Sequence, residues 1–109
     1  MPADDPRLVL TTVGSLEEAS RIARLVVEER LAACVNIVPG VQSFYWWEGR
    51  VNIEEELVLL IKTTAGMVEA LETRLGEIHP YDLPEFVVLE PEGLSARYGQ
   101  WIVDSVRPS

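Results

Sequence analysis

The most extended hydrophobic pattern in the chain belongs to two arms, residues 31–47 and 50–64, which are rich in Val, Ile, Leu and aromatic residues. These residue types favour β-strands, and each arm is much longer than the usual strand of about 5–6 residues. Between the arms, Glu48-Gly49 is a two-residue connection in which glycine can adopt the positive φ angle of a tight hairpin turn. Pro39-Gly40 interrupts the first arm, and proline in sheets is confined mainly to edges and bulges. The pattern predicts a long β-hairpin whose first arm is an edge strand bent at Pro39.

In the second arm, apolar residues alternate with polar ones, and Glu55 falls among the apolar positions. A bulge near residues 54–56 would turn Glu55 outward. Plain exposure to solvent and a place in an interface with a partner are the alternatives, and the sequence leaves them open.

The segment before the hairpin predicts a strand and a helix. Residues 8–13 form an apolar run ended by Gly14, which is typical of a strand buried on both faces. Ser15 and Glu18 fit a capping box, in which Ser15 caps the helix and Glu18 reaches back. The apolar positions that follow have the three-to-four spacing of an amphipathic helix of about 15–16 residues that ends as the hairpin begins.

The segment after the hairpin predicts a helix, a strand and a last helix. Thr63 and Thr64 are candidate caps for the first of these helices, and Pro80 must end it. Residues 85–90 are the predicted fourth strand. After Gly93 a short helix is expected, with these residues on its inner face: Leu94, Tyr98, Trp101, Ile102 and Val106.

The order strand, helix, strand, strand, helix, strand, helix is that of an α+β protein with a ferredoxin-like β-α-β-β-α-β sandwich, a long hairpin between the second and third strands, and an extra C-terminal helix. One domain is expected over residues 1–109, with an ordered core of about 8–106. Right-handed crossovers place both main helices on one face of an antiparallel sheet. The other, apolar face then needs a cover, which copies of the chain would supply.

The distal half of the hairpin carries large apolar side chains that a single small domain cannot bury. Exposed patches of this kind mark interfaces, so we expect the chain to be an oligomer. Trp46 and Trp47 could instead stack on a ligand. The predicted interface residues are Phe44, Tyr45, Trp46, Trp47, Val51 and Ile53.

Charge and composition exclude several classes of partner. The net charge is −9, whereas proteins that bind nucleic acids or anionic membranes carry clustered Lys and Arg. No apolar run approaches the roughly 18 residues of a membrane span. The first residues lack the pattern of a secretory signal, so the cytoplasm is the expected location. A single cysteine excludes an internal disulfide.

Few residues are candidates for chemistry, and the chain is not expected to be an enzyme. Cys34 is either a small buried thiol or a soft ligand for Cu(I). His79 either interacts with the dipole of the helix that it ends or is a ligand at a subunit cleft. The stiff loop after it supplies oxygen atoms from Tyr81, Asp82 and Glu85. Lys62 and Tyr81 could serve as acid and base, but nothing in the sequence fixes their geometry.

Several segments together resemble the CutA family of divalent cation tolerance proteins. They cover nearly the whole chain and are Leu31-Ala32-Ala33-Cys34-Val35-Asn36 with Pro39-Gly40, Tyr45 with Trp47-Glu48-Gly49, Leu60-Ile61-Lys62-Thr63, His79-Pro80-Tyr81 with Pro84-Glu85, and Tyr98 with Trp101. The resemblance implies a ferredoxin-like fold, a homotrimer built by the long hairpins, a likeness to PII signalling proteins and a link to copper and other divalent ions.

The chain departs from the family at the proposed copper ligands. Members proposed to bind copper use a cysteine at the end of the first strand and two histidines before the Pro-Tyr motif. Thr11 stands for the cysteine here, and Ile78-His79 stands for the pair. Cys34 matches a different family cysteine. The resemblance therefore implies the fold and the trimer more strongly than a copper site.

Three hypotheses follow. The first is a homotrimer that responds to divalent cations and binds copper or another divalent metal weakly, through His79 and with Cys34 as a lesser candidate. The second is a PII-like sensor or adaptor with small-molecule clefts between subunits, lined by Lys62, Tyr81 and Glu85. The third is a trimeric scaffold without a ligand.

Overall fold

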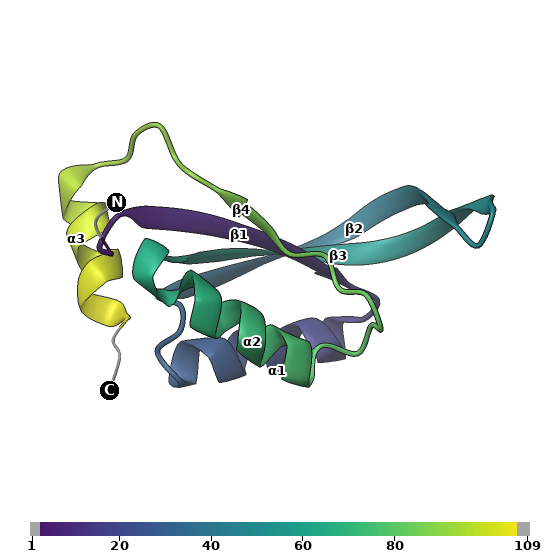
Figure 1. Ribbon diagram of the computed structural model, residues 1–109, viewed down its shortest axis with the longest axis horizontal. Coiled ribbons are helices and arrows are strands. Elements are labelled where there is room, and N and C mark those ends of the chain that lie inside the picture. Colours follow the sequence, from purple (N-terminus) through teal and green to yellow (C-terminus); the bar gives the residue numbers. More distant parts are fainter. Residues whose placement is uncertain (1–2, 107–109) are drawn as a thin grey trace.

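The computed structural model describes residues 3–106, which form one antiparallel four-stranded sheet and three α-helices (Figure 1). The elements follow one another as β1 (Pro6–Val13), α1 (Leu16–Glu28), β2 (Cys34–Trp47), β3 (Arg50–Thr64), a 3-10 turn (Ala65–Met67), α2 (Val68–Ile78), β4 (Val87–Leu89) and α3 (Ala96–Ser105). The strand order β2-β3-β1-β4 is that of the predicted ferredoxin-like fold. The fold class is confirmed.

Helices α1 and α2 lie on the same face of the sheet, and α3 lies at one end of it (Figure 1). The core is made where the two helices meet the sheet. Its fully buried side chains include Val9 from β1, Ile22 from α1, Leu59 and Ile61 from β3, and Leu71 from α2. Apolar residues at helical spacing and at strand alternation thus meet in one layer, as the sequence pattern indicates.

Strand β1 is buried on one face only, and the prediction that it is buried on both faces is wrong. Val9, Thr11 and Val13 are fully buried, whereas Leu8 and Leu10 between them are half-buried. The reason is that both helices cover the same face of the sheet, so the opposite side of β1 has no layer above it.

The hairpin turn is formed as predicted. Glu48 and Gly49 both have positive φ angles, 51° and 81°, which is the combination that a two-residue type I′ turn requires. β2 is an edge strand, and its register shifts between Val38 and Val41, at Pro39-Gly40, where Gly40 has a φ of 75°. The bend of the first arm is therefore confirmed as a bulge.

No bulge occurs at residues 54–56. Glu55 pairs with Gln42 in regular register, and its side chain is exposed in the single chain. The irregularity lies in the opposite strand because Pro39 cannot donate a ladder hydrogen bond. Plain exposure is thus the alternative that the single chain supports for Glu55.

The helix ends differ in detail from the sequence pattern. Ser15 caps α1, and its hydroxyl accepts a hydrogen bond from the Glu18 backbone N–H at 3.2 Å. The Glu18 carboxylate does not reach back but binds Arg21. Helix α1 stops at Glu28, before the expected Leu31, because Arg30 adopts a left-handed φ of 61°.

Thr63 and Thr64 do not cap α2, and this prediction is wrong. The 3-10 turn precedes the helix, and neither its start nor that of α2 has a side-chain cap. The Thr63 hydroxyl instead donates to the Leu31 carbonyl at 2.7 Å. Since Thr63 still belongs to β3, strand alternation points its side chain into the buried layer rather than toward the next helix.

The last two elements are shorter or less buried than expected. Strand β4 has three residues, so the predicted strand over 85–90 is too long. Ile102 in α3 and Val106 directly after it are buried as expected, whereas Leu94, Tyr98 and Trp101 keep exposed fractions of 41%, 38% and 45% in the single chain. This helix thus packs through one narrow stripe.

Candidate functional site

A groove of about 930 Å³ runs between the distal half of the hairpin and the segment that leads from α2 to β4. One wall comes from β2 residues 43–47 together with Glu54 and Glu56 of β3. The other wall is residues 80–87, in which Pro80 and Pro84 restrict the backbone. The volume lies in the range of small-molecule sites.

The centre of the groove is a hydrogen bond between Tyr81 and Glu56. The Tyr81 hydroxyl donates to Oε2 of Glu56 at 2.6 Å, and Glu56 is only 6% exposed. Burial, followed by the adjacent Glu56 carboxylate, raises the pKa of Tyr81 well above its usual range. Tyr81 is therefore a hydrogen-bond donor at neutral pH.

A second pair of the same kind lies farther along the hairpin. The Tyr45 hydroxyl donates to Oε1 of Glu54 at 2.7 Å, and this hydrogen bond raises the pKa of Tyr45. Glu54 and Glu56 are two residues apart on β3, so strand alternation places both on the same face. The groove therefore presents a line of carboxylates held by tyrosines.

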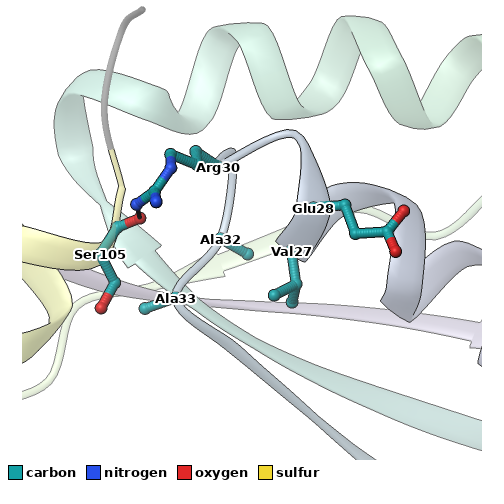
Figure 2. Close-up of a pocket in the computed structure, with 6 residues that line it drawn as sticks. All are labelled: Val27, Glu28, Arg30, Ala32, Ala33 and Ser105. Atoms are coloured by element: carbon teal, nitrogen blue, oxygen red, sulfur yellow. Dashed lines mark hydrogen bonds between the residues drawn. The ribbon is translucent and has the colours of Figure 1, made fainter.

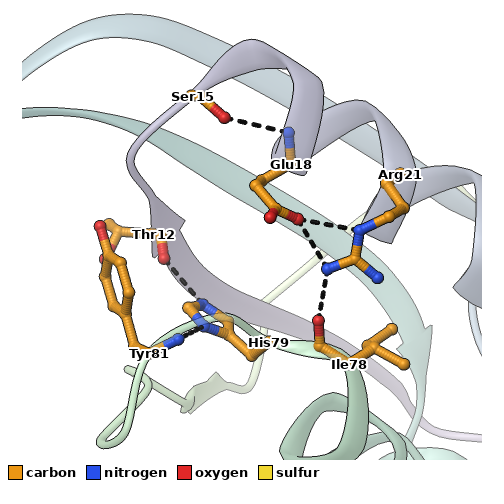
Figure 3. Close-up of polar contacts among 7 residues, drawn as sticks. All are labelled: Thr12, Ser15, Glu18, Arg21, Ile78, His79 and Tyr81. Atoms are coloured by element: carbon orange, nitrogen blue, oxygen red, sulfur yellow. Dashed lines mark hydrogen bonds and ion pairs between the residues drawn. The ribbon is translucent and has the colours of Figure 1, made fainter.

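His79 positions the segment that carries Tyr81 (Figure 3). Its Nδ1 accepts a hydrogen bond from the Tyr81 backbone N–H at 3.1 Å, and its Nε2 lies 2.9 Å from the Thr12 carbonyl oxygen. A carbonyl only accepts, so Nε2 carries the proton and the ring is neutral. Burial lowers the pKa of His79, which agrees with this state.

Arg21 completes this junction from α1 (Figure 3). Its guanidinium binds the Glu18 carboxylate and donates to the Ile78 carbonyl, at 2.5 Å, at the C-terminal end of α2. A cation at this position satisfies a free carbonyl and interacts favourably with the helix dipole. The interaction with the dipole that the sequence suggested for His79 is therefore supplied by Arg21.

The residues of one chain do not fit a copper ion at the positions matched to the family. Both His79 nitrogens are already bonded within the chain, and the fully buried hydroxyl of Thr11, a weak ligand for a soft metal, has no hydrogen-bond partner. Over residues 3–106, no group of three or more His, Cys, Asp or Glu side chains is arranged to hold a metal.

Cys34 and Lys62 lie together but away from the groove. They are cross-strand neighbours, and both contact Asn36 Oδ1, with Lys62 Nζ at 2.6 Å and the Cys34 sulfur at 3.8 Å. Lys62 Nζ also lies 5.7 Å from the centre of the Tyr98 ring. Lys62 is six residues along β3 from Glu56, about 20 Å at the usual rise per residue. Within one chain, the predicted cleft is therefore divided: Tyr81 and Glu85 line the groove, and Lys62 does not.

A smaller hollow of about 310 Å³ lies between the end of α1 and the end of α3 (Figure 2). Arg30 crosses it and donates from Nη1 to the Ser105 carbonyl at 3.2 Å. The contact joins the turn after α1 to the last turn of α3. This hollow is a junction between elements and offers few polar groups beyond that bond.

Sequence reasoning missed Glu54 and Glu56. Both alternate along β3 with the apolar residues of its other face and lie on the same face as Lys62. That alternation was a usable signal. What the sequence did not contain was the approach of Tyr81, which depends on the path of the loop around the end of β1.

Comparison with known proteins identifies relatives along nearly the whole chain. The family model for the CutA1 divalent ion tolerance protein matches residues 7–105. The divalent-cation tolerance protein CutA of Thermus thermophilus is 48% identical over 95 residues, which are 87% of this chain and 92% of that protein. A solved structure of the divalent cation tolerance protein from the same species superposes with a TM-score of 0.91 at 45% identity and covers 94% of this chain and 99% of that one.

The rice chloroplastic protein CutA 1 is 42% identical over 102 residues. The match covers 94% of this chain but only 58% of the rice protein, so this chain spans little more than half of that relative. The name of the rice protein places it in a chloroplast, and the cytoplasmic location of this chain stays a prediction. No helix in the described part of the chain is long and apolar enough to cross a membrane.

Proposed function

Because the chain belongs to the CutA1 divalent ion tolerance family, we propose that it acts in the tolerance of divalent cations as a homotrimer without enzymatic activity. The observation that supports the assembly is that the distal half of the hairpin has no further strand beside it. β1 pairs with β3 only from Leu57 to Thr64, so β3 residues 50–56 have β2 as their only neighbouring strand. We call residues 41–56 the ribbon. A two-stranded hairpin alone is marginally stable in water.

One face of the ribbon is apolar and exposed. Phe44 pairs with Ile53 and Trp46 with Val51, so alternation places these four side chains on the same face. Their exposed fractions are 64%, 60%, 74% and 52%. A surface of this kind costs free energy in water and is covered in proteins by a partner. Copies of the chain are the partner that the family resemblance implies, and the number three rests on that resemblance.

The sheet face opposite α1 and α2 supports the same assembly. Leu8 and Leu10 of β1 are half-buried there, and Val87 and Leu89 of β4 are each 42% exposed. The β4 residues pair with the β1 residues, which makes the apolar patch continuous across two strands. Packing such faces against one another would bury them.

Light scattering of the purified protein tests the assembly. The expected result is three times the chain mass of 12.2 kDa. A folded species with the mass of one chain, at concentrations near those of a cell, would contradict the proposal.

Growth of cells in copper or zinc tests the proposed role. Removal of the gene is expected to lower the metal concentration at which growth stops, and the intact chain should restore it. Unchanged tolerance in cells that lack the gene would contradict the role while leaving the assembly standing.

A second function, that of a small-molecule sensor, is favoured by one observation, the groove lined by Tyr81 and Glu56. A ligand that binds only the folded protein raises its melting temperature. A panel of metabolites at millimolar concentration is expected to contain at least one that does so. A panel without any effect would contradict this second function.

A further inference from the structure

Segment 80–85, between α2 and β4, is held by hydrogen bonds only through Tyr81. Within residues 3–106, these six residues form no backbone–backbone hydrogen bond with another segment. The Tyr81 backbone N–H donates to Nδ1 of His79 at 3.1 Å, and the Tyr81 hydroxyl donates to Oε2 of Glu56 at 2.6 Å. The position of the segment therefore depends on these two bonds.

His79 joins the segment to β1 (Figure 3). Its ring is 8% exposed, and its Nε2 donates to the Thr12 carbonyl oxygen at 2.9 Å. The rings of His79 and Tyr81 also meet edge to face, with their centres 4.8 Å apart. We call Thr12, His79 and Tyr81 the bridge. It connects segment 80–85 to β1 through the imidazole and to β3 through the Tyr81 hydroxyl.

The bridge requires a neutral imidazole. Nδ1 of His79 accepts a hydrogen bond only while it carries no proton. Since Nε2 already carries one, an added proton goes to Nδ1, which then faces the Tyr81 N–H as one donor against another. The hydrogen bond between His79 and Tyr81 is lost in this state, and the segment keeps only the bond to Glu56.

Charged groups on two elements face His79. They are Glu18 and Arg21 on α1 and Glu56 on β3. The two carboxylates favour the protonated ring, whereas burial and Arg21 oppose it. Burial has the largest effect and lowers the pKa of His79, so the ring is neutral at pH 7 and takes up a proton below the ordinary histidine pKa of about 6.5.

The surroundings of His79 suit a proton better than a metal ion. The positions matched to the family's other copper ligands hold Thr11 and Ile78. The Arg21 guanidinium donates to the Ile78 carbonyl, directly before His79 in the chain. A divalent ion at the imidazole would have to displace Thr12 or Tyr81 from its nitrogens and would lie near this positive charge.

From these contacts we propose that the bridge is a pH-sensitive switch, on which a proton and not a metal ion acts. Protonation of His79 breaks its hydrogen bond with Tyr81 and frees segment 80–85, while the body of the protein stays folded. The inference goes beyond both proposed functions and depends on neither. Residues 80–85 form the wall opposite β2 residues 43–47, so the switch acts beside the surface proposed for assembly.

Two NMR measurements on the assembled protein between pH 5 and 8 test the switch. The ring signals of His79, the only histidine, give the midpoint of its protonation. Amide exchange gives the protection factor of the Tyr81 N–H, which is expected to fall by about fivefold or more through that midpoint, the effect of one lost hydrogen bond. The order parameters of the following residues should decrease with it, whereas protection at Val9 and Leu59 stays unchanged.

Three variants connect the titration to the bridge. Glu18→Gln removes a carboxylate that favours protonation and is expected to move the midpoint to lower pH. Glu28→Gln is the matched control on the same helix, because its carboxylate pairs with Arg24 instead, and should leave the midpoint unchanged. His79→Gln has no titrating ring and should make the protection of Tyr81 independent of pH. Circular dichroism confirms folding, and the Glu18→Gln result stands without His79→Gln.

Three outcomes would overturn the inference. The first is a His79 ring that titrates while the Tyr81 amide and the following residues do not change. The second is a ring that stays neutral down to the pH at which the protein unfolds. The third concerns zinc, which as a d¹⁰ ion suits NMR: excess zinc at pH 7.5 is expected to leave the His79 signals and Tyr81 protection unchanged. If zinc altered both, a metal ion would act on the bridge.

Discussion

The body of the molecule and its ribbon are made from the same two strands but differ in what covers them. In the body, Leu59 and Ile61 of β3 are fully buried under two helices and pair with β1. In the ribbon, Val51 and Ile53 of the same strand are more than half exposed and have only β2 beside them. Large apolar side chains occur in both halves of β3. Stability in the body is thus internal, whereas in the ribbon the proposed assembly would have to supply it.

The largest expected effect on the stability of a chain comes from the body. Leu59→Ala removes a fully buried side chain and is expected to lower the free energy of unfolding by about 2–5 kcal/mol. Ile53→Ala, in the ribbon, should change it by less than about 0.5 kcal/mol under conditions where the chains are dissociated. Urea unfolding of both variants measures the difference. Similar losses in the two would mean that the ribbon is packed within its own chain.

The ribbon should instead control assembly. Ile53→Asp places a charge on its apolar face and is expected to weaken association by about 2 kcal/mol or more for each subunit, because the charge would be buried without a partner. The mass of the particle, measured against concentration, would fall toward that of one chain. Leu16→Asp is the matched control, since Leu16 is 61% exposed on α1 and Ile53 is 60% exposed. If both variants dissociated equally, general acidity and not the ribbon would be the cause.

The turn at the tip of the ribbon allows a second comparison with the body, between two glycines. Gly49 has a φ of 81°, and an added Cβ would meet no atom within 4 Å. Gly49→Ala is therefore expected to lose about 1 kcal/mol through backbone strain alone. Gly76→Ala in α2 also meets no atom but should gain about 0.5–1 kcal/mol through helix propensity. Thermal unfolding measures both changes. If Gly49→Ala lost no stability, the tip would have to adopt another type of turn.

The smallest expected effect is a pH dependence of the free energy of unfolding, which comes from His79 at the junction of the body and the groove. Burial lowers the pKa of His79 in the folded chain, so the unfolded chain binds a proton more readily. The contribution of neutral His79 to the free energy of unfolding is then fully present above the ordinary histidine pKa of about 6.5. It decreases as the pH falls below that value. His79 is the only histidine, so His79→Gln should remove this dependence near pH 6. Unfolding curves between pH 5 and 8 test it, and an unchanged slope in the variant would contradict the assignment.

Features that depend on local backbone chemistry could be predicted from the sequence. Gly49 marks the hairpin turn, Pro39-Gly40 marks the bulge, and Ser15 marks the start of α1. Each of these residues restricts or permits its own φ angle or bonds its own neighbours. The ferredoxin-like order followed from the alternation of these elements.

Features that depend on distant segments could not be predicted in the same way. Thr63 has the chemistry of a cap but lies in a strand that turns its hydroxyl to Leu31. Lys62 and Tyr81 are predicted to line one cleft between subunits; within a single chain the sheet register keeps them apart, and the cleft between copies stays a prediction. The partner of Glu56 is 25 positions away, a contact that neither periodicity nor spacing encodes.

Amide hydrogen exchange at two protein concentrations tests most directly whether the ribbon depends on a partner. At high concentration the amides of the ribbon, residues 41–56, are expected to be protected along with those of β1 and the rest of β3. At a dilution where light scattering gives the mass of one chain, the ribbon amides should exchange rapidly while Val9, Leu59 and Ile61 stay protected. Equal protection of the ribbon at both concentrations would contradict the claim.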